Sequence, residues 1–173
     1  MTSTLTAPRQ SRRSSPALDF DALYRAARDD VYAYVATLLR DRAAAEDVTA
    51  AAFERAYRKQ RTYKAGRGTE RAWLFGIARN AALDELRRRR RTTALVAEPG
   101  EVAAPDDPDL LVRRVTVRDA LNRMEPRDRE LIALKFHGDL NNGEIAKLLG
   151  QSESNVGTRL HRAVTKLREA CDA

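Results

Sequence analysis

Apolar residues in the first half of the chain recur every three or four positions, a spacing that predicts amphipathic helices. The clearest stripe consists of Phe20, Leu23, Tyr24, Ala27, Val31, Tyr34, Val35, Leu38 and Leu39. A second helix is predicted from about Ala43 to Arg61, and a third begins near Thr69 and continues into the arginine run Arg87–Arg91. The stripe of the third helix is Trp73, Leu74, Ile77, Ala78 and Ala81. No segment alternates apolar and polar residues, so no strand is predicted.

The second half of the chain has the same helical period in shorter segments. The predicted helices are Arg113–Met124, Arg127–Phe136, Glu144–Leu149 and Glu153–Glu169. Residues 92–112 contain three prolines and a glycine, which is typical of an extended linker. Residues 1–17, rich in Ser, Thr, Pro and Arg, are predicted to be a disordered arm. The pattern therefore predicts an all-α protein with two small helical domains, at 18–91 and 113–173, joined by a flexible linker at 92–112.

The charge is distributed unevenly over these segments. The chain of 173 residues has a net charge of +7, and residues 19–91 hold 17 basic and 11 acidic residues. The linker holds five acidic residues and no basic one. A basic chain favours an anionic partner, with nucleic acid first and a membrane surface second. The alternative is a basic protein whose arginines are merely solvated.

Several classes of site and location are disfavoured by the sequence. Cys171 is the single cysteine, so no intramolecular disulfide can form, and two histidines, His137 and His161, do not make an ordinary zinc site. We find no nucleophile triad or phosphate-binding glycine loop, so we expect no cofactor, no metal and no enzymatic activity. No apolar run approaches the roughly 20 residues of a membrane span. Without a signal-peptide core, we expect a cytoplasmic protein that does not insert into membranes.

Residues 141–162 carry a helix-turn-helix pattern. Asn141 and Glu144 fit a capping box, Gly150 suits the left-handed end of the first helix, and Ser152 can cap the second. A small core is expected from Ile145, Ala146, Leu149, Val156 and Leu160. The second helix of such a unit enters the major groove, where arginine can bond guanine and asparagine can bond adenine. The alternative is an ordinary helical hairpin with a solvated face.

A second motif runs from Trp73 to Asn80 and is followed by Asp84 and the arginine run. Trp73 and Phe75 beside a basic surface suit stacking on unpaired bases, and the arginines suit phosphate contacts. Helical spacing alone favours the alternative, in which Trp73 belongs to the core and the arginines are solvated.

Taken in order, the segments Ala45–Tyr57, Arg71–Asp84, Leu121–Phe136 and Asn142–Ala163 resemble the bacterial sigma factors of the extracytoplasmic function (ECF) type, group 4 of the sigma-70 family. The resemblance implies a first domain that binds core RNA polymerase and the −10 promoter element, and a second that reads the −35 element. It implies partners in the β′ coiled coil and β flap of the polymerase, in promoter DNA and, for many members, in an anti-sigma factor. The acidic linker would mimic RNA in the polymerase channel, or serve as a passive spacer.

The resemblance also assigns residues to each surface. Core-polymerase binding falls to Asp47, Val48, Phe53 and Tyr57. The residues expected to bind the −10 element are Tyr63, Lys64, Arg67, Trp73, Arg79, Asn80, Asp84, Arg87 and Arg88. The residues expected to bind the −35 element are Ser154, Asn155, Thr158, Arg159, His161 and Arg162. The chain departs from the family in having Ala50-Ala51 where Gln-Glu is usual, and Gly157 where a basic residue is frequent.

Two other functions remain open from the sequence. An autonomous helix-turn-helix regulator would bind its operator without polymerase, although the Trp73 motif and the acidic linker argue against it. An enzyme acting on nucleic acid would need a carboxylate-metal or nucleophile constellation, which the sequence does not display.

Overall fold

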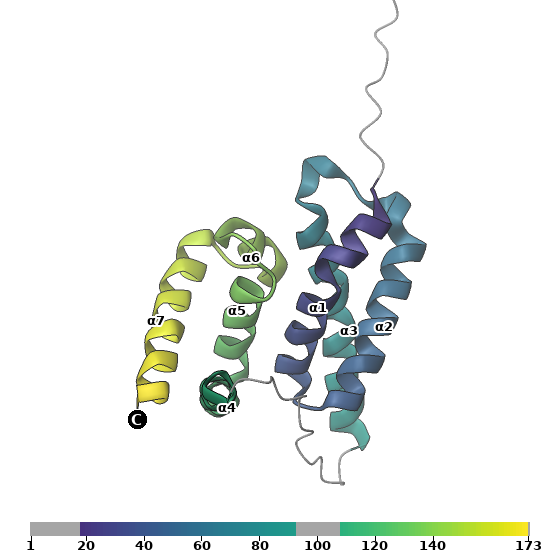
Figure 1. Ribbon diagram of the computed structural model, residues 1–173. Coiled ribbons are helices and arrows are strands. Elements are labelled where there is room, and N and C mark those ends of the chain that lie inside the picture. The colour runs from purple at the N-terminus through teal and green to yellow at the C-terminus, as the bar shows by residue number, and fades with distance from the viewer. Residues whose placement is uncertain (1–17, 93–107, 173) are drawn as a thin grey trace, which may run out of the picture.

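The computed structural model describes residues 18–92 and 108–172, with side chains for 18–92 and 113–172. These ranges contain seven α-helices and two 3-10 turns and no strand. The helices form two units that stand side by side (Figure 1). This arrangement confirms the predicted all-α fold with two helical parts. The predicted arm at 1–17 and residues 93–107 of the predicted linker lie outside the described residues.

The first unit consists of three helices and the turns between the second and third. Its elements are α1 (Phe20–Leu39), α2 (Arg42–Lys59), 3-10 turns at Gln60–Thr62 and Ala65–Arg67, and α3 (Glu70–Thr92). Aspartates begin the first two helices: the side chain of Asp19 accepts a hydrogen bond from the Ala22 amide, and that of Asp41 accepts one from the Ala44 amide, both at 3.0 Å. These caps satisfy amides that a helix start leaves without a partner.

The second unit consists of four helices. They are α4 (Pro108–Arg123), α5 (Pro126–Phe136), α6 (Asn142–Leu149) and α7 (Glu153–Asp172). The prediction that residues 108–112 belong to the linker is therefore wrong, because α4 begins at Pro108. A proline at the first helical position loses no intrahelical hydrogen bond, so Pro108 starts this helix instead of preventing it.

The helix-turn-helix elements α6 and α7 are built as the local sequence predicts. The Asn141 side chain accepts from the Glu144 amide at 2.9 Å, and the Glu144 carboxylate accepts from the Asn141 amide at 3.0 Å, which completes a capping box. Gly150 adopts φ +64° at the end of α6. The Asn155 amide donates to the Ser152 hydroxyl at the start of α7. These local bonds fix the angle at which α7 leaves the turn.

One hydrophobic core runs through both units. In the first unit, alanines at buried positions let the three helices approach closely, and Tyr34 of α1 meets Phe75 of α3 edge-to-face at 5.4 Å. In the second unit, Leu131 and Leu134 of α5 and Ile145 of α6 belong to the same cluster of buried side chains. Helix α5 packs on α1, and α6 approaches α3. The two units are thus joined by buried contacts as well as by the chain.

Replacing two different glycines of the helix-turn-helix by alanine should change the stability of the protein in opposite directions. A Cβ on Gly157 in α7 would meet only Asn142 Nδ2, at an ordinary 3.5 Å, so Gly157→Ala should stabilise the protein by up to about 1 kcal/mol through helix propensity. A Cβ on Gly150 would sit on a left-handed backbone, so Gly150→Ala should destabilise it by about 1 kcal/mol. Urea unfolding of both variants measures this. Equal midpoints for the two variants would contradict the assigned backbone geometry.

Candidate nucleic-acid interface

The outward face of α7 presents most of the residues predicted to read the −35 element. Exposed on this helix are Ser154, Asn155, Thr158, His161 and Arg162. Arg159 differs, because it is half-buried and donates to Gln151 Oε1 at 3.0 Å while pairing with Asp128 of α5 at 3.5 Å. Asp128 also holds Lys166 at 3.3 Å. The five exposed side chains form what we call the recognition face, and Arg159 anchors its helix to α5.

The loop before α3, residues 63–69 and here named the −10 loop, is held by an aromatic contact. The Tyr63 hydroxyl donates to the Gly68 carbonyl at 3.1 Å, and the Tyr63 ring meets Trp73 edge-to-face at 5.8 Å. Trp73 is partly buried against the core, so it belongs to the packing and still keeps some exposed surface. Lys64 and Arg67 are exposed on the loop. The loop therefore combines two exposed cations with a partly exposed aromatic pair.

Side chains on the next turns of α3 face three different surroundings, which are the solvent, the core and the second unit. Asn80 is exposed, as a DNA contact requires. Phe75 is fully buried against Tyr34, so the expectation that Phe75 stacks on bases is wrong: its position on α3 faces α1 instead of solvent. Arg79 forms an ion pair with Glu130 of α5 at 2.6 Å. In this conformation Arg79 is occupied by a protein carboxylate.

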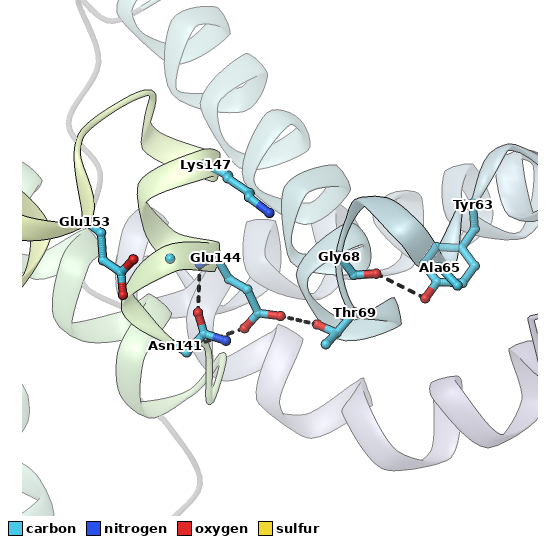
Figure 2. A pocket seen from close by; sticks show the side chains of 9 residues that line it. Tyr63, Ala65, Gly68, Thr69, Asn141, Glu144, Lys147 and Glu153 are labelled. Carbon is cyan, nitrogen blue, oxygen red and sulfur yellow. Dashed lines mark hydrogen bonds between the residues drawn. The ribbon is translucent and has the colours of Figure 1, made fainter.

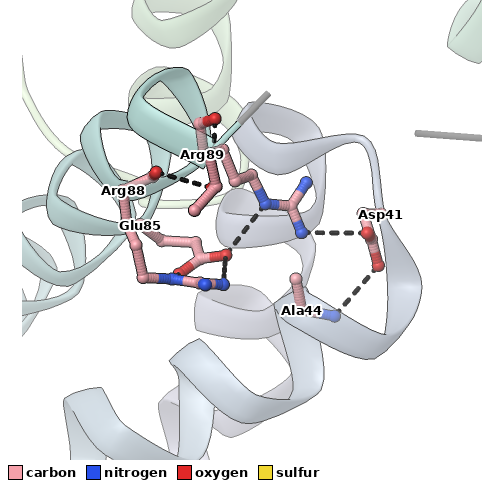
Figure 3. Close-up of polar contacts among 6 residues, drawn as sticks. Asp41, Ala44, Glu85, Arg88 and Arg89 are labelled. Carbon is pink, nitrogen blue, oxygen red and sulfur yellow. Dashed lines mark hydrogen bonds and ion pairs between the residues drawn. The ribbon is translucent and has the colours of Figure 1, made fainter. Parts of the chain in front are cut away.

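The arginine run at the end of α3 is partly neutralised by nearby acids (Figure 3). Glu85 accepts from Arg88 at 2.7 Å and from Arg89 at 2.8 Å, and Arg89 also pairs with Asp41 at 2.9 Å. The Arg88 hydrogen bonds, followed by those of Arg89, lower the pKa of Glu85 to about 2, against the effect of desolvation. Because Arg89 bonds both Glu85 and Asp41, Glu85 helps to hold the end of α3 near the start of α2.

Asp84 and Arg87 complete the set predicted for the −10 element. They pair with each other at 3.0 Å, and Asp84 also lies 3.9 Å from Arg55 of α2. Arg87 and Arg88 remain largely exposed, with more than half of each side chain in contact with solvent. Both can reach a phosphate, because surface ion pairs are weak enough to exchange partners.

The residues predicted to bind polymerase differ widely in exposure. Asp47 is exposed and Tyr57 is 60% exposed, whereas Val48 and Phe53 are only 8% and 6% exposed. The rings of Phe20 and Tyr57 meet edge-to-face at 5.2 Å over this end of α1 and α2. Asp47 and Tyr57 therefore form an exposed rim that is available for direct contacts with a partner protein. Val48 and Phe53 support this rim from within the core.

Beside this rim lies a hollow between α1 and α2. Its lining includes Tyr24, Tyr32, Thr49 and Ala50. The Thr49 hydroxyl is buried and is the one buried side-chain polar atom among the described residues without a hydrogen-bond partner. Ala50 contributes only a methyl group to this lining.

A polar pocket lies where the −10 loop faces the helix-turn-helix (Figure 2). Tyr63, Gly68 and Thr69 line one side, and Asn141, Glu144, Lys147 and Glu153 line the other. The Thr69 hydroxyl donates to Glu144 Oε1 at 2.5 Å. Sequence reasoning missed this contact and the Arg79–Glu130 pair, because the partners are 75 and 51 positions apart and no local pattern links them.

No helix within 18–92 or 108–172 has the length and apolar character to cross a membrane. The same ranges hold no group of three metal-ligating side chains.

The fold and its faces define a helical DNA-binding protein whose helix-turn-helix is joined to a second, basic unit. Comparisons with known proteins make this more specific. Sigma-70 region 2 matches residues 23–92, and sigma-70, region 4 matches residues 114–167. The ECF RNA polymerase sigma factor SigL of Mycobacterium tuberculosis is 32% identical over 166 residues, covering 91% of this chain and 94% of SigL.

A second relative agrees, and a solved structure shares the fold. The ECF RNA polymerase sigma factor BldN of Streptomyces coelicolor is 31% identical over 154 residues, covering 86% of this chain and 58% of BldN. The sigma factor RpoE of Bartonella quintana, solved in complex with the anti-sigma factor NepR, has the same fold with a TM-score of 0.77 at 24% identity, covering 90% of this chain and 98% of RpoE. The chain belongs to the ECF sigma factors, which bind core RNA polymerase and direct initiation at promoters.

The depressed pKa of Glu85 predicts an acid-sensitive contribution to stability. Its ordinary pKa is 4.5 and its pKa in the folded protein is about 2, so the stabilisation is fully present above pH 4.5 and is lost as the pH falls towards 2. Glu85→Gln should therefore lower the urea midpoint at pH 7, and this difference should shrink at about pH 3.

The exposed pair Arg42–Glu46 supplies the control. Glu46→Gln should change the midpoint little at either pH, because exposed ion pairs contribute little. A Glu85→Gln deficit that is the same at both pH values would show that the charge of Glu85 does not matter.

Proposed function

We propose that this sigma factor divides promoter recognition among three separate surfaces. The polymerase β′ coiled coil binds the rim of α1 and α2, where Asp47 and Tyr57 are exposed and Val48 and Phe53 support the surface from below. The hollow at Ala50 receives a side chain of the polymerase, which can bond the Thr49 hydroxyl. Such a bond would satisfy a buried polar group that is costly to leave unpaired.

The −10 element binds the first unit as a single strand. Bases stack near the Tyr63–Trp73 pair, and Asn80 contacts a base edge. Lys64, Arg67, Arg79, Arg87 and Arg88 contact the phosphates, and Asp84 holds Arg87 in place. Basic side chains supply affinity without sequence preference, so selectivity rests on the aromatic pair and Asn80.

The −35 element binds the recognition face of α7 as duplex. Asn155, Thr158, His161 and Arg162 lie in the groove, and Ser154 lies near the helix start, where phosphate binding is favourable. Arg159 has a second task, since its bonds to Gln151 and Asp128 fix the helix against α5. One small helix-turn-helix makes few contacts, so specificity depends on the polymerase holding both units on the same promoter.

The observation that carries the proposal is the pairing of an exposed recognition face with a separate unit bearing an aromatic-basic loop. An autonomous regulator needs the first feature but not the second. We propose that the chain contributes no catalytic group, that nucleotide addition belongs to the polymerase, and that the protein acts in the cytoplasm. An anti-sigma factor and the β flap are further proposed partners; the fold shared with RpoE, solved in complex with NepR, is in keeping with an anti-sigma factor.

Run-off transcription tests the proposal directly. The chain plus core polymerase should produce a defined transcript from a cognate promoter, and neither component alone should do so. Scrambling either element should reduce the product strongly. Tight, sequence-specific duplex binding by the chain alone, with no transcript in the presence of polymerase, would instead identify an autonomous regulator.

Within the same assay, Arg162→Ala tests the recognition face. The variant should lose about 1–3 kcal/mol of promoter binding and relax selectivity at one base pair if Arg162 reads a base. Arg168→Ala is the matched control, because Arg168 is an exposed arginine further along α7 and outside the recognition face. Equal losses for both variants would mean that only the total positive charge of α7 counts.

A further inference from the structure

The turn between α6 and α7 carries a glutamine whose side chain bonds two residues of α7. Gln151 Oε1 accepts from Arg159 Nη1 at 3.0 Å and from Asn155 Nδ2 at 3.3 Å. An amide oxygen has two lone pairs, so both of its acceptor positions are used. The backbone amide of Gln151 donates to the Ala146 carbonyl at 3.0 Å, which fixes the residue to the end of α6. Gln151 is therefore held beside the first turns of α7.

Asp128 of α5 fixes the direction of these bonds. Its carboxylate lies 3.5 Å from Arg159 Nη2, and the side chains of Arg159 and Asp128 are only 23% and 20% exposed. A guanidinium can donate hydrogen bonds but cannot accept them. Because Arg159 can only donate, Gln151 must turn its carbonyl oxygen, and not its NH2 group, towards Arg159. The orientation of the Gln151 amide thus follows from a carboxylate inside the second unit.

The orientation of Gln151 determines that of Asn155 in turn. The Gln151 oxygen can be satisfied only by a donor, so Asn155 directs its NH2 group towards it. Asn155 is exposed, which leaves its carbonyl oxygen and the second hydrogen of its NH2 group available to a partner. The recognition face therefore presents one acceptor beside one donor at this position.

This pair of groups matches one base edge of the major groove. Adenine presents there its N6 amino group, which is a donor, beside N7, which is an acceptor. Guanine presents two acceptors, O6 and N7, and would place an oxygen against the oxygen of Asn155. Cytosine offers a donor alone, and thymine offers an acceptor beside a methyl group. Adenine is therefore the base that satisfies both available groups of Asn155.

The recognition face has few cations that could replace this readout by attraction to phosphates. Arg162 is the one arginine among its side chains, because Arg159 is bonded to Gln151 and Asp128. Gly157, within the same turns of α7, contributes no side chain. Phosphate contacts carry no sequence information, so the selectivity of this face depends on side chains that bond base edges.

We propose that Gln151 is a positioning residue that holds the amide of Asn155 ready to read one adenine of the −35 element. The inference rests on the −35 binding argued under the proposed function. A side chain that is held in its binding orientation before DNA arrives loses less conformational entropy when the complex forms. Gln151 thus raises the selectivity for adenine through Asn155, without a DNA contact of its own.

Run-off transcription with the full chain and core polymerase tests this inference on a set of promoters. The set carries every possible base pair at each position of the −35 element of a cognate promoter. The wild-type chain should prefer adenine at one position by about tenfold, as expected for a bidentate contact. Asn155→Ala should abolish that preference and leave the preferences at the other positions unchanged.

Three glutamine variants separate positioning from a general structural role. Gln151→Leu should weaken the same adenine preference about threefold or more, because it removes the acceptor at similar side-chain volume. Gln151→Glu should keep the preference, because a carboxylate can accept from both Asn155 and Arg159. Gln60→Leu makes the same chemical change in the first unit and should leave the −35 selectivity at its wild-type level.

The outcomes distinguish this inference from the sigma activity itself. A wild-type chain that transcribes, with an Asn155→Ala variant of unchanged selectivity, would overturn the inference and leave the proposed function standing. The inference would also be overturned if Gln151→Leu weakened all templates equally, if Gln151→Glu did not keep the preference, or if Asn155 selected another base. A wild-type chain that yields no transcript from any template would overturn both.

Discussion

The carboxylate of Glu130 lies where the two helical units meet, bonded to Arg79 and Tyr34 of the first unit. Removing one partner from a buried ion pair leaves a charge without compensation, which costs more than the intact pair contributes. The pair is therefore stable in two situations only, with the units packed together or with both charges returned to water or to new partners. The packing of α5 on α1 and the position of α6 opposite the −10 loop depend on which situation holds.

This constraint links folding to function. The second unit can expose its recognition face in either situation, because that face lies on the side of α7 that does not pack on α5. The first unit cannot offer all of its proposed −10 surface while the units are packed together. Arg79 is a proposed phosphate contact, and in the packed arrangement it is the partner of Glu130. A DNA phosphate and the Glu130 carboxylate are similar ligands for a guanidinium. A phosphate that binds Arg79 must therefore displace the Glu130 carboxylate from it.

Features whose determinants lie close together in the sequence could be predicted from it. The capping box of Asn141 and Glu144 and the left-handed Gly150 follow from residues within one helical turn. Features that depend on distant residues could not: Arg159 lies on the predicted DNA-facing helix, but Asp128 of α5 draws it inward. The expectation that Phe75 stacks on bases is wrong for a related reason. The direction in which Phe75 points depends on its packing against Tyr34, which lies on another helix. The contacts of Glu130 join residues from α1, α3 and α5, so no motif within one helix could indicate them.

The most direct test of this account is the distance between the units in solution. Spin labels at Ala65 and Lys147, which line the same pocket from opposite units, report this distance in a Cys171→Ser background. The account predicts one short, narrow distance in the free protein and a much longer one once core polymerase and promoter are bound. A free protein that already shows the long distance, or a transcribing complex that keeps the short one, would contradict it.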